Sequence, residues 1–462
     1  MSHSIYVERR QRLAQALREA GGGVAVVPTA PERPRNSDND HPFRHDSHFH
    51  YLSGFDEPQS WLLIDAGGHS TLLCRAKDLE REIWDGVRLG PEAAPAALGV
   101  DEALAVEALD SVLPERLANQ SAVWYPFGVH GELQAQIDRW LASVRRRERS
   151  GVECPSLQRD LNPLLGEMRL IKDPQELATM RRAASISAGA HARAMRFCAQ
   201  RLRETPHGSV REYEIEAELL HEFRRHGAQS PAYPSIVAAG ANACVLHYAA
   251  GSTELRAGEL CLIDAGCELD GYASDVTRTF PASGRFSAAQ RELYDIVHAA
   301  QDAAVAATHP GARQRDAHWA AVRVLTQGMF DSGLLDRQRV GDLEAAIESG
   351  AYRQFYMHGT GHWLGRDVHD VGDYASLDEA PVEQLDGFGG KVVKKPSRVL
   401  RPGMALTLEP GLYVRPAAGV PERFWNIGIR IEDDAVVTDT GCELISRGVP
   451  VAAAEIEALM HA

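Results

Sequence analysis

Five residues with metal-binding side chains stand inside or beside apolar, strand-like segments or glycines: Asp264, Asp275, His362, Glu409 and Glu432. Burying an unpaired carboxylate among apolar side chains is costly, so these residues need a cation. Four carboxylates carry more negative charge than one divalent ion needs. Oxygen ligands with a single histidine favour Mn, Co, Fe or Zn in a paired site over thiolate zinc. Each residue alone would more simply be a salt-bridged strand end, but together they predict a dinuclear metal centre.

Further histidines gather around one of these candidate ligands. His358 and His362 stand in the glycine-rich run His-Gly-Thr-Gly-His-Trp-Leu-Gly, His369 follows it, and His247 lies earlier in the chain. The glycines favour a strand or loop over a helical histidine pair, and they allow backbone, ligand and metal to approach closely. An imidazole beside a metal centre can donate to a developing oxyanion or shuttle a proton. His247, His358 and His369 could each do this work.

The segments that carry these residues alternate between helices and strands. Helical patterns cover residues 176–203 and 210–226, and two β-rich runs at 259–266 and 272–280 predict a hairpin that carries both aspartates on paired strands. A second group of helices follows, and then strand-like runs at 405–409, 428–432 and 435–438. This order predicts an internally duplicated α+β unit. Residues 387–396 are polar and contain Gly and Lys, so we expect a surface loop there.

The first part of the chain has a different organisation. A helix is expected over residues 6–20, ended by three glycines, and short apolar strands are expected at 24–27, 61–64 and 71–74. Strands alternating with helices predict an α/β domain. Asp173-Pro174 starts the next helix with an N-cap residue and a proline. We therefore expect one domain over residues 1–172 and a second over 173–462.

Composition limits the possible functions. The 462 residues are too many for one compact core, and the net charge of −15 argues against binding nucleic acid or an anionic membrane. We see no run of apolar residues long enough to cross a bilayer. The seven cysteines include no CxxC pair, so we expect reduced thiols in a cytoplasmic protein, with no disulfide and no zinc-thiolate site. No motif of a nucleophilic serine or a nucleotide-binding loop occurs.

The motifs in combination resemble the metal-dependent pita-bread peptidases and, within them, the aminopeptidase P (Xaa-Pro aminopeptidase) family. In the second half the resemblance rests on residues 262–267, 272–280, 358–365, 367–372, 408–413 and 429–434, and in the first half on 35–38, 43–47, 52–55 and 82–84. It therefore spans nearly the whole chain. It implies an α/β N-terminal domain followed by an α+β pita-bread catalytic domain with internal pseudo-duplication.

The resemblance also implies a role for each candidate ligand. Asp264 would bind one metal ion, Asp275 and Glu432 would bridge two ions, and His362 and Glu409 would bind the other ion. Mn²⁺ is the metal that the family suggests. A hydroxide between the two ions would attack the peptide bond, with Glu409 as general base.

The remaining implied roles concern the substrate and the assembly. His369 would stabilise the oxyanion, and His247 would assist at the substrate carbonyl. His358 and Arg430 would shape the proline side of the cleft, with Tyr413 and Asp38 as partners of Arg430. Trp84 would reach the active site of a neighbouring subunit in a homotetramer, although a dimer is also considered.

The function implied is hydrolysis of the bond between an N-terminal residue and a proline at the second position of a peptide. Two alternatives are an Xaa-Pro dipeptidase (prolidase) and a non-catalytic pita-bread scaffold, and the filled ligand positions argue against the scaffold. Two features depart from the family pattern: Arg366, where an apolar residue is expected, and the insertion at residues 376–396. Neither removes a ligand, so both bear on substrate preference.

Overall fold

The structure is a computed structural model that describes residues 3–204, 209–386 and 388–462. The chain divides into two compact units, Met1–Met168 and Arg169–Ala462. The sequence placed this division a few residues later, between residues 172 and 173. The helix α7 (Asn162–Leu170) contains the point of division.

The first unit is built on one mixed sheet with the strand order β6-β5-β4-β1-β7-β8. The central pair is antiparallel, with Val26 opposite Leu63, and β7 and β8 continue the sheet in parallel. The predicted helix and strands of this domain are present. The strands are β1 (Val24–Pro28), β4 (Trp61–Asp65), β5 (Ser70–Cys74), β6 (Glu102–Ala105), β7 (Ala122–Tyr125) and β8 (Leu157–Asp160).

Helices pack on this sheet through two separate apolar clusters, one on each side. The packed helices are α1 (His3–Glu19), α2 (Ser47–Ser53), α4 (Ala94–Leu98), α5 (Leu109–Leu117) and α6 (Leu133–Arg145), whereas α3 (Leu79–Asp85) buries no residue. A short hairpin of β2 (Pro34–Asn36) and β3 (Asn39–Asp40) stands apart from the sheet and is exposed along its length.

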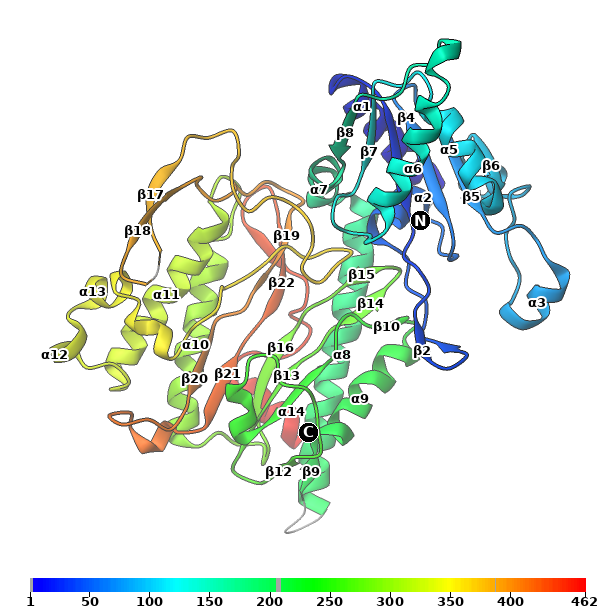
Figure 1. Cartoon of the computed structure of the whole chain (residues 1–462). Helices are drawn as coiled ribbons and strands as arrows, with labels where there is room; N and C mark the ends of the chain where they lie inside the picture. The colour runs from blue at the N-terminus through cyan, green and yellow to red at the C-terminus, as the bar shows by residue number, and fades with distance from the viewer. Residues whose placement is uncertain (1–2, 205–208, 387) are drawn as a thin grey trace. The chain divides into compact units, whose positions relative to one another are not determined.

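The second unit repeats the order that the sequence predicted. A helix pair, α8 (Pro174–Glu204) and α9 (Glu212–Arg225), precedes one group of strands, and a second pair, α10 (Ala288–Ala306) and α11 (Gln314–Asp331), precedes the other. In Figure 1 the strands of this unit lie between the two helix pairs. The main strands are β11 (Ile236–Ala239), β13 (Leu260–Asp264), β16 (Thr277–Pro281), β19 (Ala405–Leu408), β20 (Gly411–Val414), β21 (Ile427–Arg430) and β22 (Asp433–Val437). The predicted pita-bread architecture is thus confirmed.

Shorter elements complete this unit. The small strands are β9 (Val210–Arg211), β10 (Ser230–Pro231), β12 (Glu254–Leu255), β14 (Cys267–Leu269), β15 (Tyr272–Ala273), β17 (Val382–Leu385), β18 (Lys391–Lys394) and β23 (Cys442–Leu444), and the remaining helices are α12 (Arg337–Val340), α13 (Leu343–Glu348) and α14 (Ala453–His461). The helix expected from residue 210 therefore begins two residues later, because Val210 and Arg211 pair with Leu255 and Glu254.

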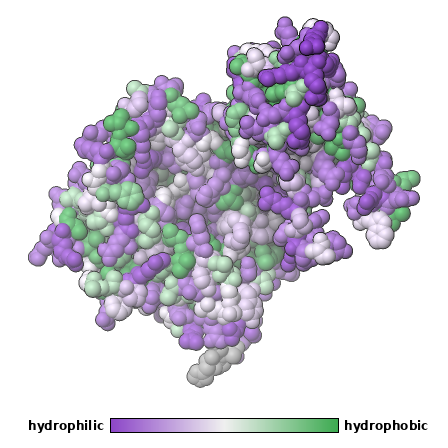
Figure 2. All heavy atoms as spheres, in the orientation of Figure 1, coloured by the Kyte–Doolittle hydropathy of each residue, from purple (hydrophilic) through white to green (hydrophobic). Residues whose placement is uncertain are grey.

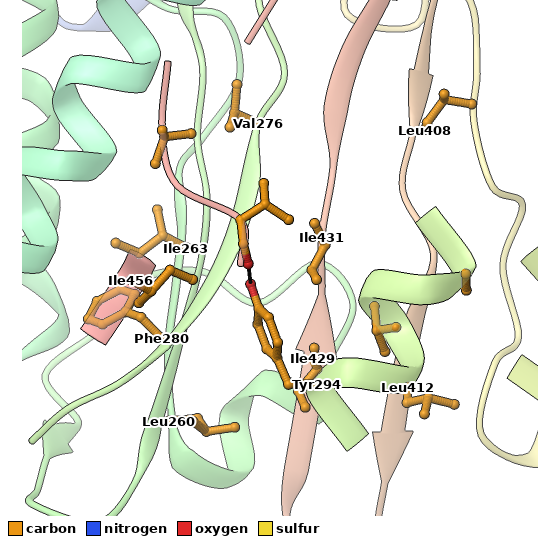
Figure 3. Close-up of a cluster of buried hydrophobic side chains, with 14 of the residues drawn as sticks. Leu260, Ile263, Val276, Phe280, Tyr294, Leu408, Leu412, Ile429, Ile431 and Ile456 are labelled. Atoms are coloured by element: carbon orange, nitrogen blue, oxygen red, sulfur yellow. Dashed lines mark hydrogen bonds between the residues drawn. The ribbon is translucent and has the colours of Figure 1, made fainter. Parts of the chain in front are cut away.

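Apolar side chains from both halves of this unit meet in one core. Figure 3 shows Ile263 of β13, Phe280 of β16 and Ile431, which follows β21, packed with Tyr294 of α10 and Ile456 of α14. Tyr294 is fully buried, and its hydroxyl donates a hydrogen bond to the carbonyl oxygen of Val451 at 2.7 Å. This rigid core fixes the ends of the strands, where the candidate ligands stand.

Two expectations about local structure change in the structure. The predicted hairpin is present, because β13 pairs antiparallel with β16 and β14 pairs antiparallel with β15, but the two ladders are separate. A Cβ atom on Gly266 would lie 1.7 Å from the carbonyl oxygen of Ser274, so only glycine permits this crossing of the two segments. Asp275 consequently lies just before β16 rather than within a strand.

The segment expected to be a surface loop contains an antiparallel hairpin instead. β17 pairs with β18, with Glu383 opposite Val393. Residues 391–394 read Lys-Val-Val-Lys, and the two β-branched valines favour a strand, a signal that the Gly and Pro residues at both ends concealed. Gly387 of the predicted loop lies outside the described residues.

The surface of both units mixes hydrophilic and hydrophobic side chains (Figure 2). All seven cysteines are free. Among the helices that the structure describes, none is long and apolar enough to span a bilayer.

Candidate metal centre

The four candidate carboxylate ligands stand at the ends of strands. Asp264 is the last residue of β13, and Asp275 lies two residues before β16. Glu409 follows β19, and Glu432 lies between β21 and β22. The backbone N–H of Glu432 donates to the carbonyl oxygen of Thr277 at 3.0 Å, which joins the two strand groups at this point. Apolar strands thus carry the acidic residues into the interior and stop where the carboxylates meet.

The structure brings ligand atoms of Asp275, His362 and Glu432 within 4.8 Å of one another. Glu409 joins this group, because its Oε1 lies 3.7 Å from Nε2 of His362. The same Nε2 lies 3.5 Å from Oδ2 of Asp275. These separations are about those between ligands of a shared metal ion, given bonds of roughly 2.0–2.2 Å.

Asp264 is connected to this group by a tyrosine that the sequence did not single out. The hydroxyl of Tyr233 approaches Oδ1 of Asp264 at 2.6 Å and Oδ1 of Asp275 at 2.5 Å. The other oxygen of Asp264 accepts a hydrogen bond from Nη2 of Arg430 at 2.6 Å. Tyr233 therefore fixes the carboxylates of Asp264 and Asp275, two of the five candidate ligands, relative to each other.

Crowding of carboxylates perturbs their protonation. Burial and the neighbouring carboxylates raise the pKa of Glu432 well above its ordinary value, and burial raises the pKa of Glu409 to about 7. Burial also raises the pKa of Asp264, although Arg430 opposes this. Burial alone would raise the pKa of Asp275, but its contact with His362 holds that pKa below the usual value. The cluster therefore carries too little positive charge of its own, which fits a site for divalent cations.

His362 is oriented for ligation. Its Nδ1 lies 3.0 Å from the carbonyl oxygen of Trp363, and because a carbonyl only accepts, Nδ1 carries the hydrogen. Nε2 is then directed at the carboxylates, and once it loses its proton its lone pair can bind a metal ion, an arrangement typical of metal-binding histidines. Burial would lower the pKa of His362, yet the hydrogen bond with Asp275 and the charge of Glu409 raise it to about 9. In the metal-free protein the protonated imidazole thus supplies the cation that the carboxylates need.

His358 uses both of its ring nitrogens within the protein. Nδ1 donates to the carbonyl oxygen of Gly359 at 2.6 Å, and Nε2 lies 2.8 Å from the hydroxyl of Tyr413. Burial and the charge of Arg430 lower the pKa of His358 to about 3, so the ring is neutral and Tyr413 donates to it. Tyr413 in turn accepts from Nη1 of Arg430 at 3.0 Å. A neutral ring held in this way fits a wall of a binding site rather than a proton shuttle.

His369 and His247 lie at the same site. The ring of His369 packs against that of His362, with centroids 3.9 Å apart. Burial and the charge of His362 lower the pKa of His369. The charge of His247 contributes to the lowered pKa values of both His358 and His369, so His247 lies within electrostatic range of both rings. Both His247 and His369 are exposed, as groups that meet a substrate must be.

Two predicted site residues lie in the first unit, and their roles stay predictions. Asp38 is exposed between β2 and β3. Trp84 is 84% exposed on α3, where Leu79 and Ile83 are each 80% exposed. Hydrophobic side chains are visible in Figure 2 at the position that α3 occupies in Figure 1.

Sequence reasoning missed several residues that support the ligands. Thr277 donates from its hydroxyl to Oε2 of Glu432 at 2.7 Å, and Thr407 stands 3.4 Å from Oε1 of Glu409. Thr277 and Thr407 each lie two residues from a predicted ligand on a strand, so the period of two could have indicated them. No comparable signal marks Tyr233, which is far from both aspartates in the sequence.

Arg366, which departed from the expected pattern, is buried with its guanidinium 4.7 Å above the ring of Tyr272. The hydroxyl of Tyr272 donates to Glu176 at 2.8 Å. Arg366 thus packs beneath the glycine-rich segment and does not enter the group of ligands.

Comparisons with known proteins agree with this geometry. The profile of metallopeptidase family M24 matches residues 178–439, and that of the aminopeptidase P N-terminal domain matches residues 6–124. The chain is 41% identical to an Xaa-Pro aminopeptidase of Escherichia coli, over 100% of this chain and 98% of that protein. It is 31% identical to human Xaa-Pro aminopeptidase 3, over 99% of this chain and 86% of the human protein.

Solved structures give the same result. The aminopeptidase PepP of Pseudomonas aeruginosa superimposes with a TM-score of 0.90 at 43% identity, covering 100% of this chain and 98% of that one. A zinc-substituted aminopeptidase P of Escherichia coli in complex with product superimposes with a TM-score of 0.89 at 41% identity, with the same coverage. With its ligands gathered at the strand ends and both family profiles matched in order, the chain belongs to metallopeptidase family M24 and carries the aminopeptidase P N-terminal domain.

Proposed function

We propose that this protein is a metal-dependent aminopeptidase that hydrolyses the bond between the first residue of a peptide and a proline in second place. The observation that carries the proposal is the group of Asp264, Asp275, His362, Glu409 and Glu432, whose donor types, together with the raised pKa values of Glu409 and Glu432, fit two divalent ions. The relatives named Xaa-Pro aminopeptidase support the substrate class. Mn²⁺ is the metal we propose, because oxygen donors with one imidazole suit it.

Two bound divalent ions would supply an activated water near neutral pH and polarise the scissile carbonyl group. Asp264 would hold one ion, Asp275 and Glu432 both ions, and His362 and Glu409 the other. Glu409 would accept the proton of the activated water as general base and return it. His369 would donate to the oxyanion as the carbonyl carbon becomes tetrahedral, and His247 would donate to the substrate carbonyl.

The proline ring requires a shaped wall, because an Xaa-Pro bond has no N–H for the enzyme to bind. His358 is neutral and immobilised by two hydrogen bonds, and Arg430 is 4% exposed and bonded to Asp264 and Tyr413. We assign His358 and Arg430 to the proline side of the site, with Tyr413 as the link between them and with Asp38 as a further partner of Arg430.

We also propose that the active form is a homotetramer in which Trp84 reaches a neighbouring active site. Leu79, Ile83, Trp84 and Val87 are each at least 80% exposed, and apolar side chains so exposed on one short segment favour a partner surface. The seven free thiols support a place in the reducing cytoplasm. The net charge of −15 supports peptides rather than nucleic acids or anionic membranes as partners.

The function is tested by product analysis with mass spectrometry. Metal-stripped protein, with and without added Mn²⁺, is incubated with a proline-second tripeptide, its alanine-second analogue and an Xaa-Pro dipeptide. We expect Mn²⁺-dependent release of the first residue from the proline tripeptide and not from the alanine analogue. Turnover of the dipeptide alone would replace the proposal with a prolidase, and cleavage of none of the three peptides would contradict catalysis.

A further inference from the structure

One fully buried carboxylate outside the metal centre contacts both ends of the loop that carries His247. Glu212 is the first residue of α9 and is 0% exposed. Its Oε1 accepts hydrogen bonds from the backbone N–H of Ala239 and from Nδ2 of Asn242, each at 2.9 Å. Both donors precede His247 in the chain.

The second oxygen of the same carboxylate binds the other side of the loop. Oε2 accepts from the hydroxyl of Tyr248 at 2.9 Å and from the backbone N–H of Gly251 at 3.0 Å. Nδ2 of Asn242 also donates to the hydroxyl of Tyr248 at 2.9 Å, which joins the two sides directly. Residues 239–251 are therefore closed into a ring around one anion.

The backbone of α9 adds to this closure. The N–H groups of Glu212 and Tyr213 donate to the carbonyl oxygens of Thr253 and Gly251, each at 3.1 Å. A carboxylate at the first turn of a helix is favoured by the helix dipole. Four donors leave no lone pair of Glu212 for proton transfer, so its contribution is to fix the loop.

We propose that Glu212 is a positioning residue for the peptidase reaction: it holds residues 239–251 and thereby fixes the position of the exposed imidazole of His247 relative to the metal centre. This inference rests on the proposed function, because it acts through His247. The loop between Cys244 and Glu254 has no regular secondary structure that would hold it otherwise. Tyr248, whose hydroxyl donates to the carboxylate of Glu212, is the residue that directly follows His247 in the chain.

The test is a double-mutant cycle between Glu212→Gln and His247→Ala. A glutamine presents an amide N–H₂ to the donor on Gly251, so that hydrogen bond is lost and two donors face each other. With a proline-second tripeptide we expect Glu212→Gln to lower kcat at least about tenfold, which is the weakening expected from losing one charge-assisted hydrogen bond. In the His247→Ala background we expect less than about a twofold further loss, because coupled residues are not additive.

Controls separate positioning from general destabilisation. Glu254→Gln changes a carboxylate just after the same loop whose partners, Arg211 and Arg256, are at the surface, and it should leave kcat within about twofold of the parent. Bound Mn²⁺ should be unchanged in Glu212→Gln. If that variant does not fold, Tyr248→Phe removes one of the four donors without leaving a buried charge unpaired, and the same coupling to His247→Ala is expected.

A second readout does not depend on activity. In protein labelled with ¹³C at histidine, the resonance missing from His247→Ala identifies His247, and we expect it to shift or broaden in Glu212→Gln but not in Glu254→Gln. Full additivity of the two kcat losses, or an unchanged His247 resonance, would overturn the inference. An undiminished kcat in His247→Ala would instead contradict the proposed role of His247, and the resonance would still test whether Glu212 positions the ring.

Discussion

Asp370 is the buried anion on which the segment carrying His369 depends. Its side chain is 1% exposed and accepts from Nη2 of Arg169 at 2.5 Å and from Nζ of Lys172 at 3.0 Å. Both cations are themselves almost fully buried. Burial alone would raise the pKa of Asp370, but the charges of Arg169 and Lys172 hold it below its ordinary value. The carboxylate of Asp370 is therefore ionised in the folded protein at neutral pH.

The substitution Asp370→Asn keeps the shape of the side chain and leaves two buried cations without their shared anion. Removing one member of a buried ion pair costs about 3–5 kcal/mol. We expect a loss of free energy of unfolding in this range for the second unit. The matched control is Asp367→Asn, because Asp367 binds the same Arg169 at 2.7 Å but its side chain is 35% exposed. A pair open to solvent contributes about 1 kcal/mol or less.

The assay is urea unfolding of the whole chain, combined with amide hydrogen exchange of peptides within residues 360–375. The sign of the pH dependence follows from the lowered pKa. The contribution of Asp370 is complete above the unfolded-state pKa of roughly 3.9 and is lost as the pH falls through the lower folded-state pKa. The difference between parent and Asp370→Asn should therefore shrink below about pH 4. An Asp370→Asn loss no larger than that of Asp367→Asn would refute the reasoning.

Four further outcomes are expected. Glu409→Gln should fold normally and lose at least about a hundredfold in kcat, since general bases contribute roughly 10²–10⁴-fold, and activity within tenfold of the parent would contradict the role. The pKa of His362 is raised to about 9, so the metal-free site holds a proton at neutral pH. Binding of Mn²⁺ should therefore release at least one proton, and its affinity should increase as the pH rises toward 9. Calorimetry in buffers of different ionisation enthalpy measures this proton release. Chelation of the metal should lower the Tm, because the carboxylates then repel one another, and scanning calorimetry with and without Mn²⁺ checks this. Trp84→Ala should weaken the assembly in light scattering and lower activity, whereas a fully active monomer would count against subunit exchange.

The sequence predicted the fold and the ligand types because both depend on local patterns. Apolar strands that end in a carboxylate are visible in the chain around Asp264, Glu409 and Glu432. The crossing at Gly266 was not predictable from the sequence, because it depends on the close approach of the carbonyl oxygen of Ser274 to Gly266, a contact that only the folded chain creates. The role of Tyr233 was not predicted for the same reason. Its hydroxyl contacts two aspartates that follow it by more than thirty positions, at no repeating interval.

The carboxylate ligands and the histidines on the substrate side of the site are held by different means. The carboxylates are fixed by sheet ladders and by the apolar core, whereas the segments around His247, His358 and His369 are irregular and are fixed by buried polar side chains. For the glycine-rich segment these are His318 and Tyr356, whose Nδ1 and hydroxyl lie 2.9 Å and 2.6 Å from the hydroxyl of Thr360.

This separation has a consequence for mutagenesis. Changes at the polar anchors should move kcat while leaving the bound metal unchanged, because four ligands stand at strand ends and the backbone of His362 is bonded to Thr407 of β19. Burial lowers the pKa of His318 to about 4, so its ring is neutral and acts through hydrogen bonding alone. His318→Asn, which retains a donor, should therefore preserve more activity than His318→Phe, with equal metal content in both. Loss of metal in His318→Phe would show instead that the glycine-rich segment, and not the sheet, sets the position of His362.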